Sequence, residues 1–303
     1  MRLLLAGGAG TLGTDIVEHL HDKHEILVID DFKDSAESEE WFAGKCKVIK
    51  CNLSEMEAFA QETIDWQPNC IIYLATTLSQ DARRGYASVN GIKNLIDLEY
   101  SSESLPRILY IQSFLTRDCS APIATDSQIQ ARDQYATWKI AGEYLLGDYS
   151  GEHSNIVLAS VISPRLTVGA IPAFTRRIAE GQAIKATLTS RDYLHPSDFI
   201  SALSALLRLP NIPKQLTIGS DVSIPTLEIA LMVGSVLDPA LVESSIDQIA
   251  PSMGDPSEVV FDSNVFRSWS GWTPTNTIDH AIAACVNQLG KTNTKVRTHH
   301  VIG

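Results

Sequence analysis

Three glycines near the start of the chain constrain its fold more than any other feature. In "RLLLAGGAGTLGTDIVEHL", Gly7, Gly10 and Gly13 separate an apolar run from an amphipathic stretch. Glycines in such a turn let the backbone approach a ligand closely and let the next helix pack tightly on the strand. The N-terminus of that helix then faces an anion. The stretch therefore predicts a phosphate-binding loop in which Gly7, Gly10, Thr11, Leu12 and Gly13 hold a dinucleotide.

Further apolar runs alternate with amphipathic stretches along the chain. The runs that predict strands are Leu3–Ala6, Ile26–Ile29, Lys47–Ile49, Cys70–Leu74, Ile108–Ile111, Asn155–Val161 and Gln215–Ile218. Strands that are apolar on both faces and alternate with helices are typical of a parallel sheet covered by helices. We therefore expect an α/β fold, a Rossmann-type doubly wound parallel sheet with a smaller C-terminal lobe.

Proline and irregular spacing become frequent after Pro164, which suggests where the lobe begins. We expect residues 1–163 to form the dinucleotide-binding domain, which also receives strands and helices from about 188–220. Residues 164–303 are expected to form mainly a substrate-binding lobe. The tail, about 291–303, has no amphipathic pattern and is expected to be frayed.

Composition argues against several classes of protein. The net charge of −12 disfavours nucleic acid as a partner, because phosphate backbones require clustered Lys and Arg. No apolar stretch reaches the ~18–20 residues that cross a bilayer, and the apolar part of "MRLLLAGGAG" is too short for a signal peptide. The five cysteines are an odd number without CxxC spacing, so neither disulfides nor a metal site is expected. These features predict a cytoplasmic protein without a membrane partner.

The second apolar run ends in "EILVIDDF" and supplies a carboxylate at the end of a strand. Asp30 stands where a carboxylate accepts hydrogen bonds from an adenosine ribose. It would repel the 2′-phosphate of NADP, and no arginine follows at once, so the predicted cofactor is NAD. Asp31 has the character of a turn residue and is kept as a further candidate contact.

Tyr135 and Lys139 in "DQYATWKIAGEYLL" are four residues apart and share one face of a predicted helix. A free tyrosine is a poor base at neutral pH, but a nearby ammonium favours its phenolate. Tyr135 could then exchange a proton with a substrate hydroxyl. The alternative is that Tyr135 and Lys139 merely share an exposed helix face. The glycine loop earlier in the chain disfavours this alternative.

Several stretches, in order along almost the whole chain, resemble motifs of the extended short-chain dehydrogenase/reductases. They are "GGAGTLG", "CNLSE", "IIYLATT", "SVNGIKNLIDL", "SRDYLHPSDFISAL" and "WSGWTPTNTIDHAI". The set is similar to the NAD-dependent nucleotide-sugar epimerase/dehydratase family, including its UDP-glucose 4-epimerase-like members. A nucleotide sugar is therefore the expected substrate.

The resemblance implies roles for single residues. Tyr135 would be the active-site base, Lys139 would bind the nicotinamide ribose, and Ser113 in "LYIQSFLTRD" would bond the reacting sugar oxygen. The further implied cofactor contacts are Asn52, Leu53, Leu74, Ala75, Thr76 and Asn90. The further implied substrate contacts are Ser160, Arg191 and His195.

The chain also departs from the family pattern. Gln112 stands where the first serine of "SSxxVYG" usually is, Asn52 replaces an aspartate, and Ser160 replaces an asparagine. The "VYG" segment is replaced by Thr116, Arg117 and Asp118.

Two residues after Ser113 bear on the reaction. Phe114 and Leu115 cannot transfer protons, whereas dehydratases and decarboxylating members use carboxylates there. This favours an epimerase, which needs only Ser113, Tyr135, Lys139 and NAD. An NAD(P)H-dependent 4-ketoreductase, or a dehydratase, is the second interpretation. A non-catalytic NAD-sensing protein is the third, although such proteins typically lose the tyrosine or lysine.

The arginines offer one candidate for a diphosphate clamp. A guanidinium bonds phosphate oxygens bidentately, and Arg191 is placed to do so; its alternative is a surface ion pair with Asp192. His195 either touches the substrate or orders the turn before Pro196. The remaining arginines are read as surface charges or auxiliary contacts: Arg83, Arg84, Arg165, Arg176 and Arg177.

Family members often pair through two helices of each subunit. Here those helices would lie around Arg84–Tyr100 and Gln134–Tyr149, so the expected assembly is a homodimer.

Overall fold

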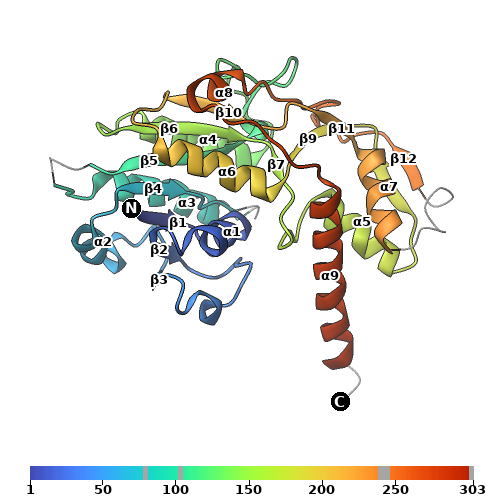
Figure 1. The fold of residues 1–303 in the computed structure, drawn as a ribbon, viewed down its shortest axis with the longest axis horizontal. Helices are drawn as coiled ribbons and strands as arrows, with labels where there is room; N and C mark the ends of the chain where they lie inside the picture. Colours follow the sequence, from blue (N-terminus) through green and yellow to red (C-terminus); the bar gives the residue numbers. More distant parts are fainter. Residues whose placement is uncertain (78–80, 102–104, 238–245, 300–303) are drawn as a thin grey trace.

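The computed structural model describes residues 1–77, 81–101, 105–237 and 246–299, and its centre is a seven-stranded sheet (Figure 1). The strand order is β10-β6-β5-β4-β1-β2-β3, and every neighbouring pair is parallel. The strands are β1 (Arg2–Ala6), β2 (Glu25–Asp30), β3 (Lys47–Lys50), β4 (Cys70–Tyr73), β5 (Arg107–Ser113), β6 (His153–Leu158) and β10 (Gln215–Ile218). The order reverses between β1 and β4, the switch point at which such folds bind ligands. The predicted Rossmann-type parallel sheet is confirmed.

The strands bury side chains on both faces, which explains why the runs are apolar at nearly every position. Leu3 and Leu5 belong to one hydrophobic cluster, and Leu4 belongs to the other. The first cluster contains side chains of α1 (Thr11–Leu20) and α6 (Pro196–Arg208). The second contains side chains of α2 (Ala60–Trp66), α3 (Ala82–Asp97) and α4 (Gln134–Leu146). Each face of the sheet is therefore covered by helices.

One predicted strand proves to be two. The run Asn155–Val161 divides at Ala159, whose amide makes a last bond to the Ile218 carbonyl of β10. Beyond it, β7 (Ser160–Val161) leaves the large sheet and pairs with β9 (Ser190–Leu194). A third strand, β11 (Ser223–Pro225), completes this smaller sheet. The continuous run hid the break because both pieces are buried, although in different sheets.

The C-terminal lobe has its own apolar cluster, which includes Ile171, Phe174, Ile229 and Ile282. Its elements are α5 (Ala170–Ala179), β8 (Ile184–Thr187), α7 (Thr226–Leu237), β12 (Ile246–Ile249) and α9 (Asp279–His299). A short helix, α8 (Asn264–Ser270), contacts β10 instead. The segment around 188–220 returns to the large sheet, since it contains α6 and β10.

The tail differs from the sequence expectation. Helix α9 continues to His299 and points away from the rest of the molecule (Figure 1), so the backbone is helical over most of the stretch expected to be frayed. Ala281 and Ile282 are buried and fix its first turns, and extending an existing helix costs far less than starting one. Residues 300–303 lie outside the described part of the chain.

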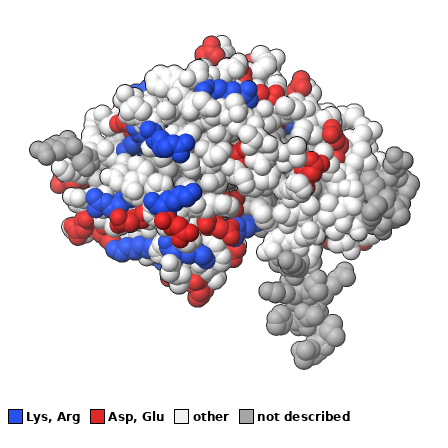
Figure 2. Space-filling model, viewed as in Figure 1, with Lys and Arg blue, Asp and Glu red and all other residues white. Residues whose placement is uncertain are grey.

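Charged side chains of both signs are mixed on the visible surface. Figure 2 shows Lys and Arg interleaved with Asp and Glu over the part that holds α1, α2 and β3. Ion pairs there include Lys47 with Glu62 at 2.7 Å and Lys50 with Glu39 at 2.9 Å. Within the described residues, no helix has both the length and the apolar character needed to span a bilayer.

Candidate active site

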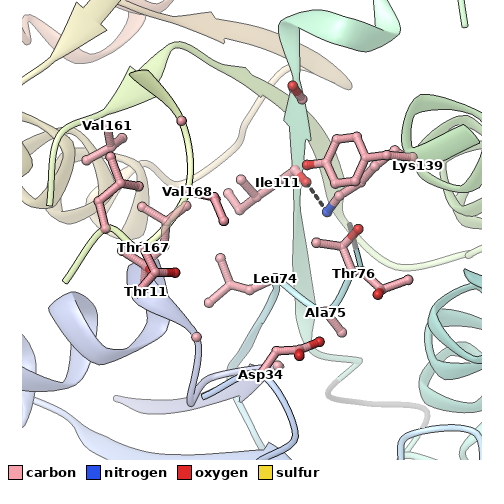
Figure 3. Close-up of a pocket in the computed structure, with 18 of the residues that line it drawn as sticks. Thr11, Asp34, Leu74, Ala75, Thr76, Ile111, Lys139, Val161, Thr167 and Val168 are labelled. Atoms are coloured by element: carbon pink, nitrogen blue, oxygen red, sulfur yellow. Dashed lines mark hydrogen bonds between the residues drawn. The ribbon is translucent and has the colours of Figure 1, made fainter. Parts of the chain in front are cut away.

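The carboxyl ends of the central strands open into a cavity of about 1260 Å³. It is lined by the loops that follow β1, β2, β4 and β5, and by the lobe. Figure 3 shows Thr167 and Val168 of the lobe on one side of this cavity and Lys139 and Thr76 on the other. Pockets for single small ligands measure roughly 300–1,000 Å³. The cavity therefore has room for a cofactor and a second ligand.

The glycine loop forms one end of the cavity. Gly7 has φ +77°, and a Cβ there would stand 2.5 Å from the Ala75 Cα atom. A Cβ on Gly13 would stand 2.4 Å from the Gly8 carbonyl oxygen, so α1 packs closely on the loop. Gly10 provides no side-chain cap for α1, which leaves its first amides to a ligand. The predicted residues fit the pyrophosphate of a dinucleotide.

Asp30 lies at the end of β2 beside this loop. Its Oδ2 accepts from the Ala9 amide at 2.9 Å and its Oδ1 from the Phe32 amide at 2.8 Å. Burial raises the pKa of Asp30, and these two backbone bonds oppose the rise. The carboxylate is thus fixed at the rim, with lone pairs left for a ligand.

Asp31 is a turn residue and also lines the cavity. It accepts from the Lys33 amide at 3.1 Å and forms an ion pair with the Lys33 ammonium at 3.1 Å. Phe32 between them has φ +59°, which marks the tight turn.

The other residues expected to contact the cofactor divide into two groups. Asn52, Leu53, Leu74, Ala75 and Thr76 line the cavity, and the Asn52 Oδ1 atom accepts from the Ser54 amide and hydroxyl, at 3.0 Å each. Asn90 lies on α3 and is not among the lining residues.

Two arginines read as surface charges are lining residues instead. Arg83 and Arg84 begin α3 at the rim of the cavity, and Arg84 forms an ion pair with Asp34. Both follow Asp81, which caps the helix by accepting from the Arg83 amide at 3.0 Å. The capped start of α3 is what brings them to the cavity.

Ser113, Tyr135 and Lys139 meet where β5 ends and α4 begins. Ser113 is the last residue of β5, and its Oγ accepts from the Leu115 amide at 3.3 Å. Asp133 caps α4 by accepting from the Ala136 amide at 2.7 Å, which fixes the turn carrying Tyr135. Lys139 donates from Nζ to the Ile111 carbonyl at 2.8 Å (Figure 3). The predicted trio is therefore assembled.

The protonation of this trio differs from the sequence expectation. Burial, assisted by the Asp133 carboxylate, raises the pKa of Tyr135 to about 12, and hydrogen bonding with Ser113 opposes the rise. Burial lowers the pKa of Lys139 to about 7. The protein alone thus keeps Tyr135 as a phenol, because loss of water outweighs the stabilisation expected from the ammonium.

Lys139 should make the stability of the fold depend on pH. Its folded pKa of about 7 lies below the ordinary value of 10.5, so between them the unfolded chain binds more protons and the free energy of unfolding rises with pH. Lys139→Met should remove up to ~1.4 kcal/mol of this rise per pH unit. Urea denaturation of both proteins between about pH 7 and about pH 10 measures the two slopes; equal slopes would contradict the lowered pKa of Lys139.

A buried polar bridge behind the trio was not predicted from sequence. Arg117, fully buried, donates from Nη2 to both carboxylate oxygens of Glu143, at 2.8 and 2.9 Å. Gln112 of β5 donates from Nε2 to Glu143 at 2.8 Å and to the Lys139 carbonyl at 3.1 Å. The bridge ties the segment after Ser113 to the helix that carries Lys139. The sequence held one indication of this bridge. Glu143 follows Lys139 by four residues, so it lies on the same face of α4 as Lys139 and Tyr135.

At the other end of the cavity, Arg191 is held by the lobe. Its Nη2 bonds Asp255 at 2.6 Å, and its Nη1 donates to the Ser190 and Pro256 carbonyls, at 2.8 Å each. The alternative ion pair with Asp192 is not formed. Asp192 is buried and accepts instead from the amides of Ser220 and Asp221, at 2.9 Å each. Adjacent residues of β9 face opposite ways, which separates the two side chains.

The other predicted substrate contacts have different outcomes. Ser160 lines the cavity. His195 does not: its Nδ1 accepts from the Ser197 amide at 3.1 Å and caps α6, so it orders the turn before Pro196.

The remaining arginines have structural partners. Arg165 bonds three carboxylates, those of Asp15 at 3.1 Å, Glu18 at 2.6 Å and Glu37 at 3.0 Å. It therefore fastens the loop after β7 to α1 and to the loop after β2. Arg177 donates from Nε to the Ala183 carbonyl at 2.5 Å. Arg176 does not line the cavity.

Comparison with known proteins agrees with this geometry. Residues 3–219 match the model of the NAD dependent epimerase/dehydratase family. The Low-salt glycan biosynthesis protein Agl12 of Haloferax volcanii is 23% identical over 307 residues, which cover 95% of this chain and 98% of that protein. The resemblance inferred from the motifs is confirmed, and with it an enzyme class whose cofactor is NAD.

Solved structures support the same conclusion. The Bordetella bronchiseptica enzyme WbmG, determined in complex with NAD and UDP, is 26% identical, with a TM-score of 0.85 and 96% of each chain covered. The dTDP-glucose 4,6-dehydratase of Bacillus anthracis, in complex with NAD, has a TM-score of 0.83 and covers 97% of this chain and 98% of its own. At 14% identity, the second likeness concerns the fold alone.

Proposed function

Because this chain belongs to the NAD dependent epimerase/dehydratase family, we propose that it is an NAD-dependent nucleotide-sugar epimerase. The observation that carries the proposal is the cavity itself. Ser113, Tyr135 and Lys139 line one cavity together with Gly10 and Asp30 of the dinucleotide-binding loops and with Arg191 of the lobe. NAD, when bound, would supply reversible acceptance of a hydride from a sugar carbon.

The protein's own residues would handle the proton and the oxygen. After giving up its own phenol proton to solvent, Tyr135 would take the proton of the sugar hydroxyl during oxidation and return it during reduction. Ser113, which lines the cavity together with Tyr135, would hold the same sugar oxygen. Lys139 lies one helical turn from Tyr135 and would bind the nicotinamide ribose.

The lining residues favour epimerisation over elimination of water. Elimination needs a second acid or base near the sugar, and Phe114 offers none. Among the described residues, the nearby carboxylates are engaged: Glu143 is bonded by Arg117, and Asp255 is paired with Arg191. Asp30 lies with the glycine loop. A 4-ketoreductase is the second candidate, but it consumes reduced cofactor, commonly NADPH, which Asp30 disfavours.

The test uses the purified protein and a panel of UDP-, dTDP-, GDP- and CDP-sugars. Denaturation first releases any bound cofactor for identification. Formation of an epimer without net change in NADH would support the proposal. Stoichiometric oxidation of NADH or NADPH with a 4-keto sugar would favour the ketoreductase instead, and loss of water would indicate a dehydratase.

Replacing Asp30 should change cofactor preference. Asp30→Ala removes a charged acceptor, and hydrogen bonds to charged groups contribute about 1.5–3 kcal/mol, so NAD affinity should fall roughly 10- to 100-fold. NADP affinity should fall less or rise, because the repulsion of the 2′-phosphate is gone. Titration calorimetry with both cofactors measures the two constants. Asp31→Ala is the matched control, and an unchanged NAD/NADP ratio in Asp30→Ala would contradict the ribose contact.

Arg191 is the proposed diphosphate clamp. A diphosphate would share or displace Asp255 and receive a charge-assisted, bidentate contact. Arg191→Met should weaken binding of UDP-sugar by about 10-fold or more and leave NAD binding unchanged. The check is to compare the change in KM for the UDP-sugar with the change in the dissociation constant for NAD. Arg177→Met is the control, because Arg177 lies outside the cavity. An equal loss of both affinities would mean that Arg191 supports the fold rather than the substrate.

We also propose a cytoplasmic homodimer that packs through α3 and α4. Tyr86 of α3 and Tyr144 of α4 are large side chains with 60% and 68% of their surface exposed. Light scattering would give twice the chain mass of 33.1 kDa. A monomeric mass at micromolar concentration would overturn the dimer.

A further inference from the structure

Three threonine side chains form a row along the lobe side of the cavity. The Thr187 and Thr189 hydroxyl oxygens are 2.8 Å apart, and those of Thr189 and Thr226 are also 2.8 Å apart. They come from the end of β8, the turn before β9 and the start of α7, and all three line the cavity. We propose that this threonine chain recognises the nucleoside of the nucleotide sugar. The inference rests on the proposed function and adds the residues that read the substrate's far end.

The first argument compares the number of hydroxyl hydrogens on the three threonines with the number of hydrogen bonds that use them. Three hydroxyls carry three hydrogens, and two bonds within the chain use two of them. Among the described residues, no acceptor is found for the third. The Thr187 and Thr189 carbonyls accept from the Thr189 and Thr226 amides, at 2.8 Å each, and neither accepts a threonine hydroxyl as well. One donor is therefore left for a ligand.

Burial makes that donor significant. Thr189 is 7% exposed and Thr226 is 5% exposed, so water reaches most of the chain only through the cavity. A buried hydroxyl without a partner is unfavourable, and a polar ligand atom in the cavity would remove that cost. Thr187 is the most exposed of the three and forms the end that a ligand can reach.

The second argument is position along β9. Tyr193 and Arg191 are alternate residues of β9, about 6.6 Å apart along the strand, and both line the cavity, as does Thr189 in the turn just before β9. Tyr193 pairs with Ser160, and the Arg191 guanidinium lies 5.8 Å from the ring of Phe114, the neighbour of Ser113. From Tyr193 to Thr189, the strand therefore leads from the reacting residues past the guanidinium and outward.

A nucleotide sugar has the same order. Its diphosphate stands between the sugar and the nucleoside, so a ligand whose diphosphate meets Arg191 brings its nucleoside toward Thr189. The hydroxyls can also reverse together, since each rotates freely about its C–O bond. The chain can then donate to a carbonyl or ribose oxygen, or accept from an N–H of a base.

The test compares Thr189→Val, which removes the middle hydroxyl at nearly constant shape, with Thr189→Ser, which keeps it. Titration calorimetry on the NAD-loaded protein uses UDP, dTDP, GDP and CDP, and inorganic pyrophosphate as the probe without a nucleoside. The tightest nucleotide should bind Thr189→Val roughly 3- to 10-fold more weakly, which is the usual effect of one neutral hydrogen bond. Pyrophosphate should bind both variants and the parent alike, and Thr189→Ser should stay within about twofold of the parent.

Each outcome has one meaning. Unchanged nucleotide affinity in Thr189→Val, or an equal loss for pyrophosphate, would overturn the inference and leave the proposed function standing. If none of the four nucleotides binds the parent protein, the proposed function fails and the inference fails with it. If the Thr189→Val loss for UDP recurs with 2′-deoxy-UDP, the contact is to the base; if 2′-deoxy-UDP shows no loss, it is to the ribose hydroxyl. Thr187→Val removes the hydroxyl at the exposed end of the threonine chain. It should weaken nucleotide binding as Thr189→Val does, without altering the buried residues Thr189 and Thr226.

Discussion

Tyr135→Phe should lower kcat by about 10²- to 10⁴-fold, the usual contribution of a positioned acid or base. The variant keeps the ring and loses only the hydroxyl, so NAD affinity and the free energy of unfolding should stay close to those of the parent. The pKa of Tyr135 near 12 means that the residue is a phenol in the protein alone, so it can donate its proton directly during reduction and must lose that proton before it acts as a base during oxidation.

The matched control is Tyr144→Phe on the same helix. Tyr144 is 68% exposed and does not line the cavity, so loss of its hydroxyl should leave kcat unchanged. Full activity of Tyr135→Phe with the best sugar of the panel would refute the acid/base role and revive the reading of a non-catalytic NAD-sensing protein.

Arg117→Met should destabilise the protein by about 3–5 kcal/mol, the usual cost of breaking a buried ion pair from one side. The guanidinium has no exposed surface, and its removal leaves the Glu143 carboxylate buried with Gln112 as its remaining partner. Urea denaturation followed by circular dichroism gives the change in free energy.

A double variant separates the effect of an unpaired buried charge on stability from the effect of the changed side-chain shape. Arg117→Met with Glu143→Met replaces both charges by side chains of similar length, so most of the lost stability should return. Asp118→Ala, next in sequence but exposed at 40% of its side chain, should change stability by less than about 0.5 kcal/mol. A loss below about 1 kcal/mol in Arg117→Met would mean that water reaches the pair and that the bridge is not a buried one.

The sequence predicted features that depend on near neighbours. The glycine loop, the carboxylate of Asp30 and the pair Tyr135–Lys139 are each defined by residues a few positions apart, and the structure places them as expected. The seven strands followed from apolar runs, because a strand covered on both faces must be apolar throughout.

Features that depend on distant pairing were not predicted. The bridge joins Arg117 to Glu143, 26 residues away, and nothing local distinguishes a buried arginine from an exposed one. Arg165 looked like an auxiliary substrate contact because its three carboxylate partners are up to 150 residues distant. The break at Ala159 was hidden for a similar reason, since hydrogen-bonding partners, not composition, decide where one sheet ends.

His195 and Asn90 show the limit of motif matching. Each occupies its motif position, yet His195 caps α6 and Asn90 lies on α3 away from the cavity lining. A motif fixes which residue occurs at a position, while the direction of its side chain depends on the packing of the whole element.

The change of sheet at Ala159 fixes the spacing of backbone positions along the candidate active site. Ser113 is in register with Leu158 in the large sheet, and two residues later Ser160 is in register with Tyr193 in the small one. Arg191 lies two residues further along the same strand. The spacing between the backbone positions of Ser113 and Arg191 is thus set by strand pairing. Substitutions in the lining would change which groups the cavity presents, but they would leave this spacing as it is.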